Sequence, residues 1–150
     1  MNPTHKNILI VAYILEMITA VCHLLWNLLG YKNNNDLLGI SYLALMIMGL
    51  ILAYIVRFKS KDEVIYHHSI YYTRSFWVYL LVLTLIISVG LGFIFLAVST
   101  NSSILHNSMF YMSIFVVVLS HIIIIWFIYR MIKGLVYLWR EQDIHFKSWK

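Results

Sequence analysis

The side chains best placed to do chemistry lie inside a long apolar segment near the start of the chain. Glu16, Thr19, His23 and Asn27 recur at i, i+3, i+7 and i+11, so all four share one face of a helix. Because an ionisable group is costly to hold in lipid, this polar stripe is expected to face the interior of a helix bundle. Glu16 would then either take part in a proton path or sit protonated, bonded to a hydroxyl or a carbonyl, and hold helices together.

Polar groups on other apolar segments are expected at the depth of Glu16. Counted from the inner ends of their segments, Glu16 and Thr84 each lie about 12 Å deep, and His121 lies about 13–16 Å deep. The sequence therefore predicts one layer that contains Glu16, Gly49, Thr84 and His121, with a contact between Glu16 and His121. His23 lies about 10 Å further from the inner surface.

The same histidines raise the question of a haem. Two axial imidazoles must reach the iron at one depth, whereas His23 and His121 are offset by about two helical turns. The chain has no Cys-x-x-Cys-His motif, and its single cysteine, Cys22, leaves no partner for an intrachain disulfide. No cofactor or metal is therefore expected, although a quinone site near aromatic residues at the inner surface stays open.

The elements that must position these residues are membrane-spanning helices. Hydrophobic residues make up 62% of the chain and charged residues only 11%, which a soluble domain of 150 residues could not accommodate. Runs of about 20 apolar residues are long enough to cross a bilayer as helices, and these runs lack the alternation of barrel strands. The sequence predicts a single all-α domain over residues 1–150. Its four spans are expected at 8–29, 37–58, 76–98 and 110–131.

The distribution of basic residues predicts the orientation of the spans. Of the eleven Lys and Arg residues, only Lys32 falls on the opposite side from the rest. The other ten are Lys6, Arg57, Lys59, Lys61, Arg74, Arg130, Lys133, Arg140, Lys147 and Lys150. By the positive-inside rule, both termini and the central connection lie in the cytoplasm, at a bacterial inner membrane. With its charge beside apolar runs and no soluble basic domain, the chain is not expected to bind nucleic acid.

Two stretches beside the spans are amphipathic. Ser60 and Glu63 form a capping-box pattern that predicts a helix from near Lys61, and residues 61–75 place aromatic side chains at helical spacing. Residues 132–142 carry basic side chains on one face and apolar ones on the other. Both are expected to lie along the inner surface as interfacial helices, attracted to anionic lipid headgroups. The alternative for 132–142 is a plain extension of the fourth span.

The strongest local motifs flank the third and fourth spans. Residues 68–77 carry His-x5-Arg-Ser-Phe-Trp, and residues 129–135 read Tyr-Arg-x-Ile-Lys-Gly-Leu. These stretches resemble the His-x5-Arg-Thr-Phe-Trp and Tyr-Arg-Ile-Ile-Lys-Gly motifs of a family of small four-span bacterial inner-membrane proteins of unknown function. That family is loosely grouped with the four-helix component of the chloroplast inner-envelope protein-import apparatus. The likeness covers roughly residues 8–144 and implies the four-helix fold, with Ser75 standing where Thr is usual and 140–142 departing from an Asn-Asp-Gly turn.

Residues of these motifs are expected to meet at the inner surface. His68, Arg74, Trp77, Arg130 and Lys133 would lie where the third and fourth spans reach the cytoplasm. Guanidinium groups there would hold a lipid phosphate or the carboxylates of a partner. The alternative is ordinary charge that only sets topology.

No soluble catalytic motif is present, so no enzymatic activity is expected. The leading interpretation is a non-enzymatic membrane component that binds lipid or a partner, which could be another membrane protein or a second copy. One alternative is a small transporter or proton-coupled carrier that uses Glu16 and His121. Another is an immunity protein against a pore-forming toxin. A carrier needs a water route to Glu16, whereas a binding component tolerates a dry interior.

Overall fold

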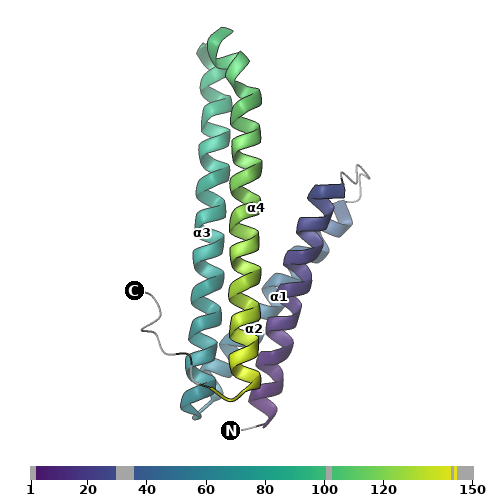
Figure 1. The fold of residues 1–150 in the computed structure, drawn as a ribbon, viewed down its shortest axis with the longest axis vertical. Helices are drawn as coiled ribbons and strands as arrows, with labels where there is room; N and C mark the ends of the chain where they lie inside the picture. The colour runs from purple at the N-terminus through teal and green to yellow at the C-terminus, as the bar shows by residue number, and fades with distance from the viewer. Residues whose placement is uncertain (1–2, 30–35, 101–102, 143, 145–150) are drawn as a thin grey trace. The chain divides into compact units, whose positions relative to one another are not determined.

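The computed structural model describes residues 3–29, 36–100, 103–142 and 144 (Figure 1). Within these ranges the side chains of 26–29, 36–40 and 103–106 fall outside the description. The described residues form four helices. They are α1 (Pro3–Leu29), α2 (Asp36–Lys59), α3 (Glu63–Thr100) and α4 (Ser103–Trp139). Each predicted span lies inside one of these helices, and the all-α prediction is confirmed.

Each of these helices is long and apolar enough to cross a membrane. Two of them exceed what a span requires: α3 has 38 residues and α4 has 37. At ~1.5 Å rise per residue they reach about 57 and 55 Å, against about 30 Å for the hydrocarbon core. Large apolar side chains cover their outer faces, including Leu81, Phe95 and Phe110, each more than two-thirds exposed. A surface of this kind suits lipid and would be a liability in water.

The stretches predicted as separate interfacial helices are continuous with the spans. Residues 61–75 supply the first turns of α3, and 132–142 supply the last turns of α4 and its cap. No Gly or Pro interrupts 60–89, so nothing in the sequence breaks α3 at the expected boundary. The plain-extension alternative therefore describes the end of α4 better. The start of α3 also differs from expectation because Tyr71, Tyr72, Thr73, Ser75 and Phe76 are buried.

The start of α3 is capped differently from the prediction. The carboxylate Oδ1 of Asp62 accepts a hydrogen bond from the backbone N–H of Ile65 at 3.4 Å, and the Ser60 hydroxyl accepts one from the N–H of Asp62. Asp62 is thus the N-cap residue, and the helix begins at Glu63. The predicted capping box of Ser60 and Glu63 is wrong by two residues, because an Asp adjacent to the helix start competes successfully for the cap.

The chain divides into two compact units. The first contains Met1–Phe76 and Phe127–Lys150, and the second contains Trp77–Trp126. In the first unit α1 packs against α2, together with the first turns of α3 and the last turns of α4. The large, fully buried side chains belong to this unit, with the exception of Ile124 in the second. They are Leu9, Tyr13, Glu16, Val56, Ile65, His68, Tyr72, Thr73, Phe127, Met131 and Leu138.

The second unit is the remainder of α3 and α4. It buries few side chains, among them Tyr79, Ile86, Ala97 and Ile124. Gly90 allows close approach here, since a Cβ at that position would lie 2.9 Å from Cγ2 of Val116. Most of its surface is apolar and exposed, so this unit is suited to contact with lipid.

Candidate functional site: a buried polar core and a cationic rim

The polar core of the first unit is centred on Glu16. Its side chain has no exposed surface, and its Oε1 accepts a hydrogen bond of 2.9 Å from the hydroxyl of Tyr72. Glu16 lies on α1 and Tyr72 on α3, so this bond joins two helices whose residues are separated by 56 positions. In the described part of the chain, the second carboxylate oxygen, Oε2, has no hydrogen-bond partner.

A glycine on α2 makes room for this pair. A Cβ placed on Gly49 would lie 2.7 Å from the Tyr72 hydroxyl oxygen and 3.1 Å from Oε1 of Glu16. Real Cβ atoms do not approach other atoms as closely as the first of these distances, so only glycine fits between them without movement. The backbone of α2 at Gly49 therefore packs directly against the Glu16 carboxyl and the Tyr72 hydroxyl.

A second tyrosine and a second glycine complete the core. The Tyr13 ring meets the Tyr72 ring edge-on, with centroids 5.1 Å apart and an angle of 84° between the planes. The Tyr13 hydroxyl donates a long hydrogen bond of 3.3 Å to the carbonyl oxygen of His68. A Cβ on Gly134 of α4 would lie 2.6 Å from the Tyr13 ring and hydroxyl. We call Tyr13, Glu16, Gly49, Tyr72 and Gly134 the tyrosine–glutamate core; it draws on all of α1 to α4.

The predicted polar stripe on α1 is only partly inside this core. Thr19 is buried, and its hydroxyl donates to the carbonyl oxygen of Leu15 on the same helix. His23 is exposed, so the prediction that it faces the bundle interior is wrong. The reason is its place along the helix: α3 contributes to this unit only up to Phe76, one turn beyond Tyr72, whereas His23 lies two turns beyond Glu16. The side chain of Asn27 lies outside the described residues.

The predicted layer around Glu16 is right about Gly49 and wrong about the residue from α3. The observed hydrogen-bond partner is Tyr72, roughly twelve residues before Thr84. Thr84 is exposed in the second unit, and its hydroxyl donates to the carbonyl oxygen of Leu80. His121 also belongs to the second unit, where its Nδ1 lies 2.7 Å from the carbonyl oxygen of Val117. The contact predicted between Glu16 and His121 stays a prediction.

A second polar group joins α3 to α4 in the first unit. The guanidinium of Arg130 stacks 4.2 Å from the centre of the Tyr71 ring, and its Nε donates a 3.1 Å hydrogen bond to the Ser75 hydroxyl. In return, the Tyr71 hydroxyl reaches the carbonyl oxygen of Arg130 at 3.4 Å. Ser75 in turn donates to the carbonyl oxygen of Tyr71 at 2.7 Å. Arg130 is therefore held in one orientation by a ring and a hydroxyl.

The remaining predicted surface residues divide between exposed and buried positions. Arg74 is exposed and close enough to Arg130 for the two positive charges to repel each other. Lys133 is half-buried, with its ammonium 5.9 Å from the centre of the Tyr137 ring. Trp77 is half exposed in the second unit. We call Arg74, Arg130 and Lys133 the cationic rim of the first unit.

His68 does not belong to the cationic rim. Its side chain is fully buried, and its Nε2 lies 2.9 Å from the carbonyl oxygen of Gln142, just beyond the end of α4. The prediction that His68 touches lipid or a partner at the surface is therefore wrong. A buried imidazole needs an internal hydrogen-bond partner, and the end of α4 supplies one that the sequence does not reveal.

The end of α4 has an unusual cap. Gln142 N–H donates to the carbonyl oxygen of Tyr137, and Glu141 N–H donates to that of Leu138, which is the Schellman pattern. The residue at the left-handed position of this motif is normally glycine, but here Glu141 adopts a φ of 57°. Its carboxylate forms an ion pair of 2.7 Å with the ammonium of Lys6 on α1. The hydrogen bond and charge of Lys6 hold the pKa of Glu141 below its ordinary value of 4.5.

The sequence does not single out the residues that close the first unit. Its pattern over 61–75 predicts an interfacial position for Tyr72, and no pattern pairs Tyr13, Lys6 or Glu141 with residues far along the chain. Glycines inside apolar helices are the sequence feature that indicates close packing here, since Tyr72 packs against Gly49 and Tyr13 packs against Gly134. Among the described residues, no three His, Cys, Asp or Glu side chains come close enough to hold a metal ion.

Comparisons with known proteins give no identity for the chain. No protein-family model matches it, and neither a curated protein nor a solved structure matches it. The resemblance of residues 68–77 and 129–135 to a four-span family therefore stays a prediction.

Proposed function

We propose that this chain is a non-enzymatic component of a bacterial inner membrane that binds anionic groups at the cytoplasmic surface, with both termini inside. The ligands would be lipid phosphates or the carboxylates of a partner. The observation that carries this proposal is the cationic rim: a guanidinium fixed by Tyr71 and Ser75 lies within electrostatic range of the exposed Arg74.

The chemistry of the rim favours an anion. Arg74 and Arg130 repel each other, and a phosphate or carboxylate between them would replace that repulsion with charge-assisted hydrogen bonds. Arg130 is already ordered by its ring and hydroxyl contacts, so binding would lose little side-chain entropy. Lys133 follows one helical turn after Arg130 on α4 and adds a third positive charge to the rim.

The tyrosine–glutamate core favours this role over that of a carrier. A carrier that used Glu16 would need a water route to its carboxyl, yet the Glu16 side chain has no exposed surface and is enclosed by Tyr72 and Gly49. A carboxyl in that setting serves to join α1 and α3 through hydrogen bonding. This arrangement supports a dry interior, which a binding component tolerates.

The test is lipid retention after purification. The wild-type protein and the variants Arg74→Gln and Arg74→Gln/Arg130→Gln would be extracted in mild detergent with acyl-matched phosphatidylglycerol and phosphatidylcholine, and bound lipid counted by native mass spectrometry. Lys61→Gln, an exposed cation outside the rim, is the matched control. We expect phosphatidylglycerol retention by the double variant to fall roughly tenfold or more, near the lower end of the range for a hydrogen bond to a charged group. Unchanged retention in both folded rim variants would refute anion binding at the rim.

Orientation is tested separately. A reporter domain that is active only in the cytoplasm should be active when fused to either terminus, because ten of the eleven basic residues favour that side. Fusions that report opposite sides for the two termini would overturn the proposed topology.

A further inference from the structure

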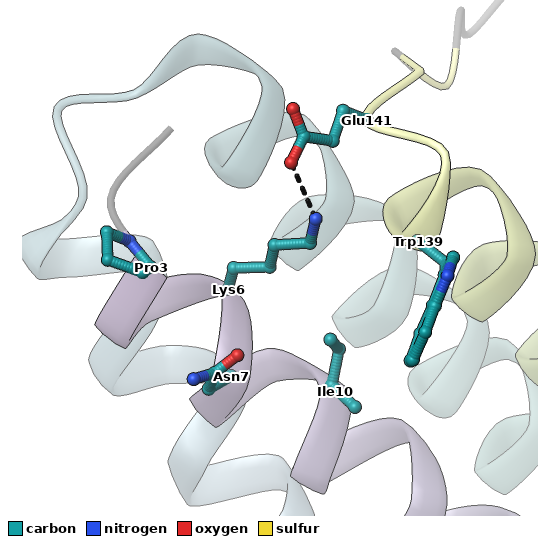
Figure 2. A pocket seen from close by; sticks show the side chains of 6 residues that line it. All are labelled: Pro3, Lys6, Asn7, Ile10, Trp139 and Glu141. Atoms are coloured by element: carbon teal, nitrogen blue, oxygen red, sulfur yellow. Dashed lines mark hydrogen bonds and ion pairs between the residues drawn. The ribbon is translucent and has the colours of Figure 1, made fainter.

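An open pocket of the first unit that carries paired charges lies between the start of α1 and the end of α4. Its volume is about 460 Å³, within the range of small-ligand sites. Pro3, Lys6, Asn7 and Ile10 line it from α1, and Trp139 and Glu141 line it from α4 and its cap. Figure 2 shows the Lys6 ammonium directed at the Glu141 carboxylate, with Ile10 and Trp139 beside them. None of these residues belongs to the cationic rim.

We propose that this pocket binds the headgroup of an aminophospholipid, phosphatidylethanolamine, with the phosphate on Lys6 and the primary ammonium on Glu141. The proposal rests on the membrane placement given above and is independent of anion binding at the rim. A zwitterionic headgroup carries one negative and one positive group a few bonds apart. The pocket offers one cation and one anion in direct contact, at 2.7 Å.

The exposures of the two charges match the order of groups in the lipid. Lys6 is 20% exposed and lies one helical turn from Ile10, whereas Glu141 is 61% exposed at the outer side of the cap. In a phospholipid the phosphate lies nearer the acyl chains and the ammonium lies further out. Ile10 and the indole of Trp139 provide apolar contacts for the glycerol and upper acyl chain, and tryptophan is favoured at this depth of a membrane. The pocket therefore has the polarity of the lipid it would hold.

The backbone at Glu141 supports a ligand role for its side chain. A non-glycine residue at a φ of 57° is strained, and glycine would relieve that strain at this position of the cap. The Glu141 side of the ion pair with Lys6 is open to solvent, so the pair contributes little to stability. A carboxylate held there, with most of its surface open, is free to exchange one ammonium for another.

Other common headgroups fit the pocket less well. Phosphatidylcholine has no N–H to donate to Glu141, because its nitrogen carries three methyl groups. Phosphatidylglycerol has no cation, so the carboxylate would repel it while Lys6 attracts it. Phosphatidylethanolamine satisfies both side chains with charge-assisted hydrogen bonds.

The experiment compares acyl-matched phosphatidylethanolamine, phosphatidylcholine and phosphatidylglycerol, offered in equal amounts to the purified full-length protein and counted by native mass spectrometry. The variants are Glu141→Gln, which removes the acceptor charge, and Lys6→Glu/Glu141→Lys, which keeps the ion pair but reverses its order. Glu63→Gln, an exposed acid on α3 outside the pocket, is the matched control. Thermal unfolding of each variant verifies that it is folded.

We expect the wild-type protein and Glu63→Gln to retain phosphatidylethanolamine over phosphatidylcholine by roughly tenfold or more, near the lower end of the range for a hydrogen bond to a charged group. Glu141→Gln and the reversed pair should lose this preference. Equal retention of the two lipids by the wild-type protein, or an unchanged preference in the folded Glu141→Gln or reversed variant, would overturn the proposal. Arg74→Gln distinguishes the two sites, since it should lower the amount of bound phosphatidylglycerol and leave the amount of bound phosphatidylethanolamine unchanged.

Discussion

The hydroxyl of Tyr72 donates a 2.9 Å hydrogen bond to the carboxyl of Glu16, and both side chains are fully buried. This bond sets the level at which α3 meets α1. It lies in the stretch of α3 that hydropathy alone would assign to a membrane surface. The first unit is thus built around a polar contact whose residue on α3, Tyr72, lies one turn before the start of the third predicted span.

The Tyr72 hydroxyl should contribute measurably to stability. Tyr72→Phe is expected to lower the free energy of unfolding in mixed micelles by about 0.6 kcal/mol, the average for hydrogen bonds between membrane helices, and by no more than about 1.7 kcal/mol. Tyr66→Phe, at an exposed tyrosine of the same helix, should have little effect. In a double-mutant cycle with Glu16→Leu, which removes the acceptor that Glu16→Gln would retain, the two changes should be strongly non-additive. Additive effects would show that the Tyr72–Glu16 bond does not form.

Replacing either of the two core glycines with alanine should destabilise the protein. Gly134→Ala is expected to destabilise the protein by about 1–3 kcal/mol, because the new Cβ would overlap the buried Tyr13 ring. Gly49→Ala should act in the same direction through the Tyr72 hydroxyl and Glu16. Gly92→Ala is the matched control, since a Cβ there meets nothing within 4 Å. It should leave stability unchanged or raise it by up to about 1 kcal/mol. The same free-energy measurements decide this, and a Gly134→Ala variant as stable as Gly92→Ala would contradict the packing.

The hydrogen bond from the Arg130 guanidinium to the Ser75 hydroxyl should contribute to stability. Ser75→Ala removes the acceptor for Arg130 Nε and is expected to lower stability by about 1 kcal/mol. Ser69→Ala, which removes a buried hydroxyl bonded to the carbonyl of Tyr66 nearby on its own helix, should cost less. In an Arg130→Lys background, Ser75→Ala should cost no more than Ser69→Ala, because an ammonium cannot reproduce both the stacking on Tyr71 and the directed Nε bond. Thermal unfolding of each serine variant in the wild-type and Arg130→Lys backgrounds checks this. A Ser75→Ala effect that is equal in the two backgrounds would argue against the contact.

The Lys6–Glu141 pair predicts a dependence of stability on acid pH. The folded-state pKa of Glu141 is lowered, so the folded protein keeps this carboxylate ionised at a lower pH than the unfolded chain does. Its stabilisation is complete well above the ordinary pKa of 4.5 and is lost as pH falls through the lowered value. The difference in melting temperature between the wild-type protein and Glu141→Gln should therefore shrink as pH falls below about 4.5. The change should be small because the carboxylate is exposed, and a difference that grows on acidification would contradict the pairing.

The fold could be predicted from the sequence because apolar length and helical preference are local properties. The runs around Glu16, Gly49, Thr84 and His121 each identified a helix, and a continuous apolar run in lipid has few alternatives to one. The extent of α3 and α4 was harder to predict. Hydropathy detects where polar side chains begin, but the helix itself continues until something breaks it.

The site was less predictable because its contacts depend on relative depth. Counting residues from hydropathy boundaries placed Thr84 beside Glu16, whereas the helices are offset so that Tyr72 occupies that level. The burial of Glu16 and Thr19 followed from the cost of polar groups in lipid. The pairing of His68 with Gln142 and of Lys6 with Glu141 depends on how the end of α4 turns. A Schellman cap with glutamate at its left-handed position has no sequence signal.

The accessibility of the interior to water tests the central claim most directly. Thr19 is 2% exposed and lies one turn from Glu16 on the same face of α1. In a Cys22→Ala background, a Thr19→Cys variant in membrane fragments open on both sides would be treated with a charged, membrane-impermeant thiol reagent. A protein with a dry interior should leave this position unlabelled while Lys61→Cys, at an exposed site, is labelled completely. Labelling of folded Thr19→Cys at the rate of Lys61→Cys would reveal a water route beside Glu16, and the chain would then have to be regarded as a carrier.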